Sequence, residues 1–309
     1  MRSLVLGANG FLGAALVDHL SGLGHEVTAF DRYSAGTVRF SSGARILRGD
    51  LLNAADLEQA VEGQDLVFHF VSTTTPASVE LEPRVDIRTN VSATLDLLDA
   101  SVAAGVKRVY FASSGGAVYG DQGLRSYAET DLALPISPYA IGKITIEHYL
   151  RYYEKEHGLD SVVLRLSNPY GPGQDPNRRQ GFIPIALGRV REGRPVIVFG
   201  EGTMTRDYTY VSDVIGMIGQ LAQGEPQHRV YNLGSGVGYS IVEVLECIRS
   251  VTGRSFGVEY APSPRTFVEH VVLNIDRYRA EFGEPALTSL EDGIAATWAT
   301  LPPTPGVFT

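Results

Sequence analysis

Tyr139 and Lys143, four residues apart, are the side chains of this sequence whose types and spacing point most directly to chemistry. The spacing places them on one face of a helix, for which Ser137 is a suitable N-cap and Pro138 a suitable first residue. Tyrosine is a poor base at neutral pH because its ordinary pKa is about 10. A nearby ammonium favours the phenolate and lowers that pKa, so the pair predicts proton transfer at a substrate hydroxyl, coupled to hydride transfer.

A glycine-rich segment near the start of the chain, GANGFLG at residues 7–13, lies between a predicted strand and a predicted helix. Glycines in that position allow a tight turn and let the backbone approach a pyrophosphate at the helix N-terminus. Asp31 ends the next predicted strand, at about the distance along the chain expected of a carboxylate that binds a ribose diol. A carboxylate there also repels a 2′-phosphate, so we expect NAD in preference to NADP.

The residues expected to contact the cofactor belong to the glycine loop, to the strand ends that follow it, and to the Tyr-Lys helix. Asp50, at the end of the third predicted strand, is expected to lie near the adenine, and Lys143 near the nicotinamide ribose. The full set is Gly7, Asn9, Gly10, Phe11, Leu12, Gly13, Asp31, Arg32, Asp50, Leu51, Phe70, Val71, Ser72, Tyr139 and Lys143.

Strands and helices that could position these residues alternate along the first half of the chain. Continuous apolar runs predict buried strands at 3–7, 26–31, 44–50, 65–72, 108–114 and 161–168. Helical patterns lie between them at 11–22, 54–62, 84–104 and 138–157. The alternation predicts an α/β fold with a doubly wound parallel (Rossmann) sheet. The carboxyl ends of its strands would carry Gly7, Asp31, Asp50, Ser72, Ser113, Ser114 and Asn168 along one edge.

The second half of the chain has a different pattern. Residues 168–177 are rich in Pro, Gly and Asn and predict a loop, followed by helices at 182–192 and 240–251 and strands at 195–200, 206–211 and 229–232. We predict an NAD-binding domain over 1–167 plus about 207–235 and a smaller C-terminal α/β substrate-binding lobe over about 168–206 plus 236–300. Residues 301–309 are expected to form a loose tail.

Composition argues against several classes of partner. The chain has 309 residues and a formal net charge of −9, which disfavours nucleic acid and anionic membranes. No apolar run reaches the length of about 18 residues that a membrane helix needs, and no signal peptide is evident, so we expect a cytoplasmic protein. The single cysteine, Cys247, cannot form an internal disulfide. We expect no metal site.

Six motifs, taken together and in this order, resemble the extended short-chain dehydrogenase/reductase family. Within it, the chain is similar to nucleotide-sugar epimerases of the UDP-glucose (UDP-galactose) 4-epimerase type. The resemblance covers about residues 1–300 and implies bound NAD, a UDP-sugar substrate, carbohydrate metabolism such as polysaccharide biosynthesis, and a homodimer formed through the helices at 84–104 and 138–157. The motifs are GANGFLG (7–13), SSGGAVYG (113–120), YAIGK (139–143), RLSNPYGPGQ (165–174), GEGTMTRDYTYVSD (200–213) and YNLGSG (231–236).

The resemblance also implies catalytic roles. Tyr139 would take a proton from the sugar 4-hydroxyl, and Lys143 would tune that tyrosine and bind the ribose. A serine after the fifth strand would hydrogen-bond the same sugar oxygen. Ser114 is our choice for that serine and Ser113 the alternative, because Gly115 occupies the place where the family usually has a third Ser or Thr.

For the substrate, the resemblance implies that Asn168 contacts the diphosphate and that Arg206 and Arg265 clamp it, a task suited to the guanidinium fork. Val198 and Phe199 would lie beside the base. The complete expected substrate set is Ser114, Gly115, Gly116, Asn168, Phe182, Val198, Phe199, Arg206 and Arg265.

The segment that follows Ser113 and Ser114 distinguishes the chain from related enzymes. Dehydratases of the family carry an Asp-Glu pair, and decarboxylases a glutamate, where this chain has Gly116 and Ala117. The hypothesis is therefore an NAD-dependent 4-epimerase acting through a transient 4-keto sugar, on a UDP-hexose or UDP-N-acetylhexosamine. Two alternatives stay open: an NAD(P)H-dependent 4-ketoreductase of a nucleotide deoxysugar, and a non-catalytic dinucleotide-sensing protein.

Overall fold

The structure is a computed structural model that describes residues 1–34, 36–74, 79, 82–123, 125–177, 181–264 and 266–301. Arg265, expected to clamp a diphosphate, lies outside the described residues, as does the predicted tail from residue 302 onward.

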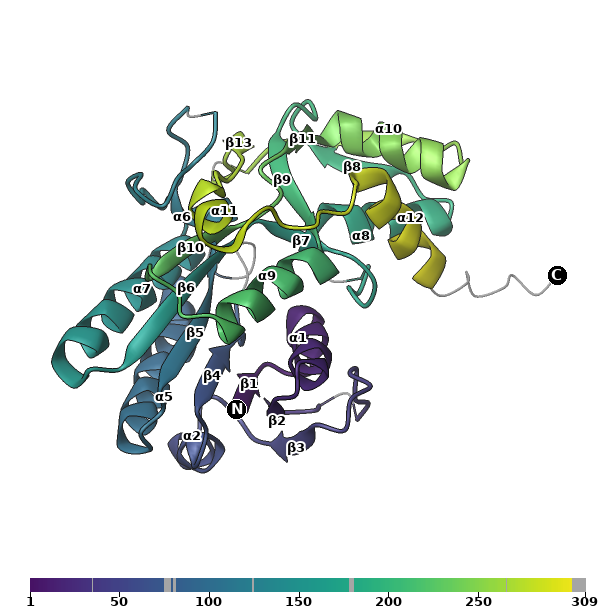
Figure 1. Ribbon diagram of the computed structural model, residues 1–309. Helices are drawn as coiled ribbons and strands as arrows, with labels where there is room; N and C mark the ends of the chain where they lie inside the picture. Colours follow the sequence, from purple (N-terminus) through teal and green to yellow (C-terminus); the bar gives the residue numbers. More distant parts are fainter. Residues whose placement is uncertain are drawn as a thin grey trace.

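Seven parallel strands form the main sheet of the molecule (Figure 1). The order across the sheet is β10-β6-β5-β4-β1-β2-β3, so the direction of winding reverses beside β1. A reversal of this kind opens a crevice at the carboxyl ends of the strands, where ligands of such folds bind. The predicted doubly wound parallel fold is confirmed. The strands are β1 (Arg2–Leu6), β2 (Glu26–Asp31), β3 (Arg45–Arg48), β4 (Leu66–His69), β5 (Arg108–Ser114), β6 (Asp160–Leu166) and β10 (Val230–Leu233).

Helices cover both faces of this sheet, because successive side chains of a buried strand point to opposite faces. On β1, Val5 belongs to the core shared with α1 (Phe11–Gly22) and α9 (Val211–Gln223). Leu4 and Leu6 belong to the core on the other face, with α2 (Ala54–Val61), α5 (Ser92–Ala103) and α7 (Pro138–His157). Figure 1 shows the two groups of helices on either side of the sheet. None of the described helices is long and apolar enough to cross a membrane.

A smaller lobe follows, built on two short sheets. β9 (Thr205–Tyr210) pairs with β7 (Asn168–Tyr170), β11 (Gly238–Ser240) and β13 (His270–Val271), and β8 (Val196–Phe199) pairs with β12 (Val258–Ala261). Its core is formed by side chains such as Ile183, Val244 and Ile294. The helices are α8 (Phe182–Arg191), α10 (Ile241–Thr252) and α12 (Leu290–Thr300), whereas α11 (Asp276–Phe282) packs beside β10.

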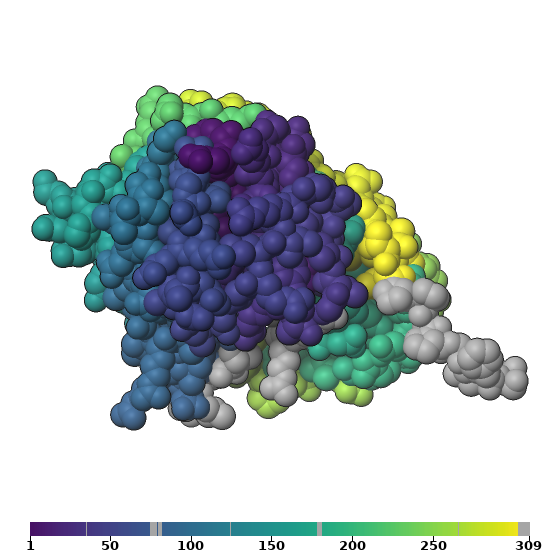
Figure 2. Space-filling view, turned by 90° about the horizontal axis from the view of Figure 1, so that it is seen from below, coloured from purple at the N-terminus to yellow at the C-terminus, as the bar shows by residue number. Residues whose placement is uncertain are grey.

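The chain crosses between the two sheets more than once, since β9 lies in the smaller lobe while α9 and β10 belong to the larger one. Figure 2, seen from below, shows residues of the first third of the chain gathered on one face, with later residues at its rim. The division into an NAD-binding domain and a substrate lobe, with the boundaries given above, stays a prediction.

Three local expectations differ from the structure. The loop predicted at 168–177 begins with β7, a short strand that tolerates Pro169 because a proline can lie in a strand where its missing N–H is not needed. The helix predicted at 84–104 is three consecutive pieces, α4 (Pro83–Asp86), a π-helical turn η1 (Ile87–Val91) and α5. α9 had no counterpart in the prediction, because two glycines interrupt its apolar pattern, and α11 and α12 had none either.

Candidate functional site

The glycine loop between β1 and α1 is compact enough to exclude side chains. Gly7 has a left-handed φ of 81°, and a Cβ there would lie 3.0 Å from the backbone of Phe70 and Val71. A Cβ on Gly13 would lie only 1.9 Å from the carbonyl oxygen of Gly7. The backbone of this loop is therefore open to close approach by a ligand, as a pyrophosphate site requires.

The carboxylate at the end of β2 is attached to the glycine loop. Asp31 Oδ2 accepts a hydrogen bond from the backbone N–H of Asn9 at 3.0 Å, and Oδ1 accepts one from Tyr33 at 3.3 Å. The Asn9 side chain in turn binds the backbone of Thr37 and Arg39. The predicted juxtaposition of Asp31 and the loop is thus present, and these groups fit the pyrophosphate and ribose of a dinucleotide.

Other residues of the expected cofactor set are less closely connected. Asp50 Oδ1 accepts a hydrogen bond from the nearby Leu52 N–H, and Ser72 Oγ donates one to the Thr74 carbonyl, so both bind local backbone. Leu51 is buried in the core that Leu4 and Leu6 of β1 share with α2 and α5. Of the remaining members, Arg32 is exposed, and the others are half-buried: Gly10, Phe11, Leu12, Phe70 and Val71.

The Tyr-Lys pair lies where α7 meets the end of β5. Ser137 caps α7 through its side chain, which accepts a hydrogen bond from Ala140 N–H, so the helix begins as the sequence predicts. Lys143 is buried, and its Nζ donates a hydrogen bond of 2.8 Å to the carbonyl oxygen of Ala112. The same ammonium lies 4.7 Å from the ring centroid of Phe111 and 5.7 Å from that of Tyr139.

Tyr139 interacts with Ser114. Burial raises the pKa of the Tyr139 hydroxyl to about 12, a hydrogen bond with the Ser114 side chain acts to lower it, and the charge of Asp86 adds to the rise. Without further positive charge the tyrosine is thus a phenol. A cation bound beside it would be needed to make the phenolate accessible near neutral pH.

Whereas the pKa of Tyr139 is raised, the pKa of Lys143 is lowered. Burial lowers the pKa of its ammonium to about 8, while the charges of Asp86 and Glu147 act to raise it. His69 of β4 also lies nearby, and burial, assisted by the Lys143 charge, lowers its pKa to about 3. That histidine is therefore neutral, and its Nε2 lies 2.9 Å from the hydroxyl of Thr94.

The neighbouring serine, Ser113, has a different partner. Its Oγ donates a hydrogen bond of 2.5 Å to Oε1 of Glu147, whose carboxylate also binds Arg165 of β6. Arg165 continues to the Tyr119 hydroxyl at 3.0 Å, and that hydroxyl donates to Oδ1 of Asn232. Our sequence reasoning missed Glu147, although its position four residues beyond Lys143 on the same helical face was a usable signal.

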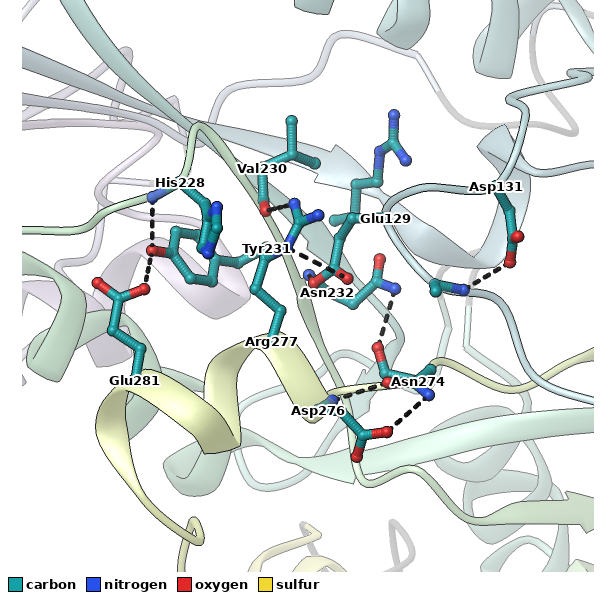
Figure 3. A network of polar contacts seen from close by, with 12 residues as sticks. Glu129, Asp131, His228, Val230, Tyr231, Asn232, Asn274, Asp276, Arg277 and Glu281 are labelled. Carbon is teal, nitrogen blue, oxygen red and sulfur yellow. Dashed lines mark hydrogen bonds and ion pairs between the residues drawn. The ribbon is translucent and has the colours of Figure 1, made fainter.

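Figure 3 shows how this network continues around β10. The backbone N–H of Asn232 donates a hydrogen bond of 2.8 Å to Oε1 of Glu129, and the Asn232 Nδ2 donates one of 3.0 Å to the Asn274 carbonyl. Arg277 of α11 donates to the Val230 carbonyl. These contacts hold the segment before α11 against β10.

That segment explains the glycine after the two serines. A Cβ on Gly115 would lie 2.6 Å from a methyl group of Leu273, so a Ser or Thr cannot occupy this position without displacing the leucine. Gly116 faces Asn168, whose Nδ2 would be 3.5 Å from a Cβ there. Asn168 Nδ2 donates to the Asp207 carbonyl at 3.2 Å. The structure thus brings Gly116 and Asn168 together near the end of β5.

The remaining expected substrate residues lie in the smaller lobe. Arg206 donates hydrogen bonds to the carbonyls of Thr205, Val268 and Glu269, and burial lowers the pKa of its guanidinium. These contacts use a large part of its hydrogen-bonding capacity. Phe182, at the start of α8, is half-buried against the core of the lobe.

Val198 and Phe199 differ in exposure. Val198 is buried in the lobe core, whereas Phe199 is 44 % exposed and lies edge-on to Phe267 with ring centroids 5.6 Å apart. A hollow of about 260 Å³ lies beside Phe199 and Gly200. A larger hollow, about 560 Å³, lies at the amino ends of β1 and β2, beside Arg2 and Glu26. It contains none of the expected site residues.

The chain is similar to several known proteins. Residues 3–234 match the family described as NAD dependent epimerase/dehydratase. The chain is 32 % identical over 304 residues to a UDP-glucose 4-epimerase of Mycolicibacterium smegmatis, covering 96 % of this chain and 97 % of the relative. It is also 32 % identical to a dTDP-4-dehydro-6-deoxyglucose reductase of Escherichia coli over 228 residues, 74 % of this chain and 72 % of the relative. A solved UDP-glucose 4-epimerase of Thermotoga maritima with UDP-glucose superposes with a TM-score of 0.91 at 33 % identity, covering 97 % of this chain and 98 % of that one.

Proposed function

The chain belongs to the NAD-dependent epimerase/dehydratase family, and from that premise we propose that it inverts C4 of a nucleotide-activated sugar through a transient 4-keto sugar. The observation that carries the proposal is the meeting of three side chains where α7 joins the end of β5. Ser114 acts to lower the pKa of the Tyr139 hydroxyl, and the buried ammonium of Lys143 lies 5.7 Å from the Tyr139 ring centroid. The next residues, Gly115, Gly116 and Ala117, supply no acid or base. This constellation suits chemistry at one carbinol carbon.

In the proposed mechanism Tyr139 is the base and then the acid. Its phenolate accepts the proton of the sugar 4-hydroxyl, and the phenol later returns a proton to the 4-oxygen after the sugar has presented its other face. Each half of the reaction leaves Tyr139 in the form that the other half needs. The proton is therefore conserved over one turnover, as an epimerisation requires.

Ser114 and Lys143 support this proton transfer. The Ser114 hydroxyl would hydrogen-bond the 4-oxygen as well as Tyr139, which orients the sugar for transfer. The Lys143 ammonium would stabilise the phenolate electrostatically and hold the nicotinamide ribose. We assign Ser114 this role in preference to Ser113, because Ser113 Oγ donates to Glu147.

The cofactor of the family is NAD. When bound, NAD supplies reversible hydride exchange with C4 of the sugar. We propose that Gly7, Gly10 and Gly13 accommodate its pyrophosphate and that Asp31 binds the adenosine ribose. The compact glycine loop and the carboxylate attached to it support this assignment.

The substrate is proposed to be a UDP-hexose or a UDP-N-acetylhexosamine. The similarity to a UDP-glucose 4-epimerase solved with UDP-glucose supports the nucleotide. Asn168 would contact the diphosphate and the exposed ring of Phe199 would lie by the base. The Arg206 guanidinium already donates hydrogen bonds to three backbone carbonyls, so only its remaining N–H groups would contribute to the diphosphate site.

One experiment separates this proposal from its alternatives. Purified protein is incubated with a panel of UDP-hexoses and UDP-N-acetylhexosamines without added cofactor, and products are resolved by chromatography. Interconversion of two 4-epimers is the expected result. Failure with every UDP-sugar, together with stoichiometric NAD(P)H consumption on a 4-keto deoxysugar, would contradict the proposal.

The second candidate is a 4-ketoreductase of a nucleotide deoxysugar, favoured by the similarity to the dTDP-4-dehydro-6-deoxyglucose reductase. It would use the same tyrosine, lysine and serine, but it would exchange its cofactor at each turnover. A protein that only senses the dinucleotide would, by contrast, lose nothing detectable when Tyr139 becomes Phe.

We further propose a cytoplasmic homodimer formed through α5 and α7. The face of α7 that carries Ile141, Tyr149 and Tyr152 is exposed, and Ile87 of η1 is 58 % exposed beside it. This apolar stripe lies on the side of α7 away from Tyr139 and Lys143 and would be covered in a dimer. Light scattering that reports a monomer at working concentration would count against it.

A further inference from the structure

We propose that Asp86 is the counter-charge that keeps Lys143 in its ammonium form, and that Gly142 is the residue that admits this carboxylate to the side of α7. The inference deepens the proposed function and rests on it for its catalytic consequence. Asp86 is thus a positioning residue that acts through Lys143. Nothing in the sequence patterns of the cofactor or substrate sites points to it.

The first observation is steric. Asp86 is a carboxylate with only 3 % of the residue exposed, at the end of α4, which packs against α7. A Cβ on Gly142 would lie 1.8 Å from Asp86 Oδ2, far inside van der Waals contact. The carboxylate therefore touches the backbone of α7 between Tyr139 and Lys143, and only glycine at position 142 leaves room for it.

The second observation is the absence of a cation bonded to Asp86. Its Oδ1 accepts hydrogen bonds from the hydroxyl of Thr74 at 2.5 Å and from the amide of Asn90 at 2.7 Å. Both donors are neutral, and within the described ranges no Lys, Arg or His forms an ion pair with Asp86 at 4.0 Å or less. A buried carboxylate with only neutral donors needs a positive charge nearby, because unpaired buried charges are costly.

Lys143 is a buried ammonium that needs a negative charge nearby. Its Nζ donates to a neutral carbonyl, that of Ala112, and other charged groups around it are already accounted for. Glu147 on α7 is bound to Arg165 of β6 in a buried ion pair. His69 of β4 is neutral, because burial lowers its pKa to about 3.

The direction of the electrostatic effects agrees with this assignment. Burial lowers the pKa of Lys143, and of the two carboxylates that oppose this effect Asp86 is the stronger. The same carboxylate raises the pKa of Tyr139, together with burial. Asp86 therefore favours the ammonium form of Lys143 and disfavours the phenolate form of Tyr139. Its removal should lower both pKa values and move the pH profile of epimerisation towards acid.

Lysine NMR tests the inference directly, because the chain has only three lysines, Lys107, Lys143 and Lys155. Protein labelled with ¹³C at lysine Cε is titrated in the form in which it is purified. The two exposed lysines are assigned with Lys107→Arg and Lys155→Arg. Asp86→Asn should lower the Lys143 pKa by about one pH unit.

The matched control is Asp96→Asn, which removes one negative charge from an exposed position on α5. This variant should leave the Lys143 pKa unchanged. Equal titration curves for Asp86→Asn and Asp96→Asn would overturn the inference. If Asp86→Asn does not fold, Gly142→Ala keeps the acid but puts a methyl group where Oδ2 lies, and the Lys143 pKa should again fall. An unchanged titration in Gly142→Ala would then overturn it.

The NMR result does not depend on the substrate, so failure of the proposed function is distinguishable from failure of the inference. A lowered Lys143 pKa in a protein that epimerises no UDP-sugar supports the counter-charge and contradicts only the reaction. Where epimerisation is observed, the acid and alkaline limbs of the kcat profile of Asp86→Asn should both move to lower pH. Loss of activity with unmoved limbs would indicate a purely structural role and contradict the catalytic consequence.

Discussion

The Oγ of Ser113 lies 2.5 Å from Oε1 of Glu147, and it donates a hydrogen bond to that carboxylate. The adjacent residue, Ser114, acts on Tyr139 instead, because its side chain acts to lower the pKa of the Tyr139 hydroxyl. Two neighbouring serines at the end of β5 thus serve two different turns of α7. One contact joins the strand to a buried ion pair, and the other reaches the tyrosine that we propose as the base.

The two serines should therefore respond differently to truncation. Ser114→Ala removes the partner of Tyr139 and of the sugar oxygen, and we expect kcat to fall by about 10²-fold with little change in stability. Ser113→Ala removes a buried hydrogen bond and should cost about 1 kcal/mol of unfolding free energy, with a much smaller effect on kcat. Steady-state epimerisation and urea denaturation of both variants check this. A larger kcat loss for Ser113→Ala would transfer the catalytic role to that serine.

Tyr139→Phe tests the base itself. The variant keeps the ring and loses only the hydroxyl, so we expect kcat to fall by about 10³-fold or more while bound NAD is retained. NAD content is measured by absorbance after denaturation and activity by product chromatography. Retained activity would contradict the assignment, and loss of NAD would show that the variant disturbs the cofactor site as well.

The alkaline limb of the kcat profile should report Lys143. Its pKa of about 8 implies that the ammonium is lost as the pH rises through 8, so stabilisation of the phenolate declines on that side. Lys143→Arg keeps a positive charge far into the alkaline range, because an Arg pKa exceeds 12. Its kcat should be lower throughout, but its alkaline limb should shift upward or vanish. A limb that stays near pH 8 would assign the titration to another group.

The glycine loop offers a test of packing with a control in the same helix. Gly13→Ala would bring a Cβ within 1.9 Å of the Gly7 carbonyl, so the loop must shift. We expect NAD affinity to fall at least tenfold, measured by fluorescence titration of the apoprotein. Gly22→Ala lies in the same α1, where a Cβ meets no atom within 4 Å. It should leave NAD affinity unchanged and alter stability by less than about 1 kcal/mol.

The buried pair of Glu147 and Arg165 should matter more to stability than a surface pair. Both side chains are 8 % exposed, and Arg165→Met would leave the carboxylate uncompensated, at a cost of about 3–5 kcal/mol in unfolding free energy. Glu284→Gln, which breaks the exposed pair with Arg279, should cost less than about 1 kcal/mol. Urea denaturation of the two variants makes the comparison. A double variant with Glu147→Gln should recover part of the Arg165→Met loss.

Much of the larger domain was predictable because its signals are local. The continuous apolar runs of β2 and β5, the glycine turn before α1, and the Ser137 cap of α7 each depend on residues close in the chain. The spacing of Tyr139 and Lys143 likewise needs only the helical period. Family membership followed from long motifs, and the comparisons confirm it.

The smaller lobe was harder to predict, because its strands are short and depend on partners far away in the chain. β7 exists through its pairing with β9, about forty residues later, and its Pro169 reads locally as a loop. α9 carries glycines that weaken its helical pattern, yet it is held by the buried surface of α1 and the sheet. Tertiary burial, not local propensity, stabilises both elements.

The sequence by itself determined which side chains could transfer a proton and where a dinucleotide could approach the backbone, because both depend on residue type and short spacing. Only the tertiary structure decided which serine faces Tyr139, since Ser113 and Ser114 are adjacent and differ only in what α7 brings to each. It also decided the charge around Lys143. Asp86 is more than fifty residues away in the chain, and the packing of α4 on α7 brings its carboxylate to Gly142 in an interior where charges interact strongly.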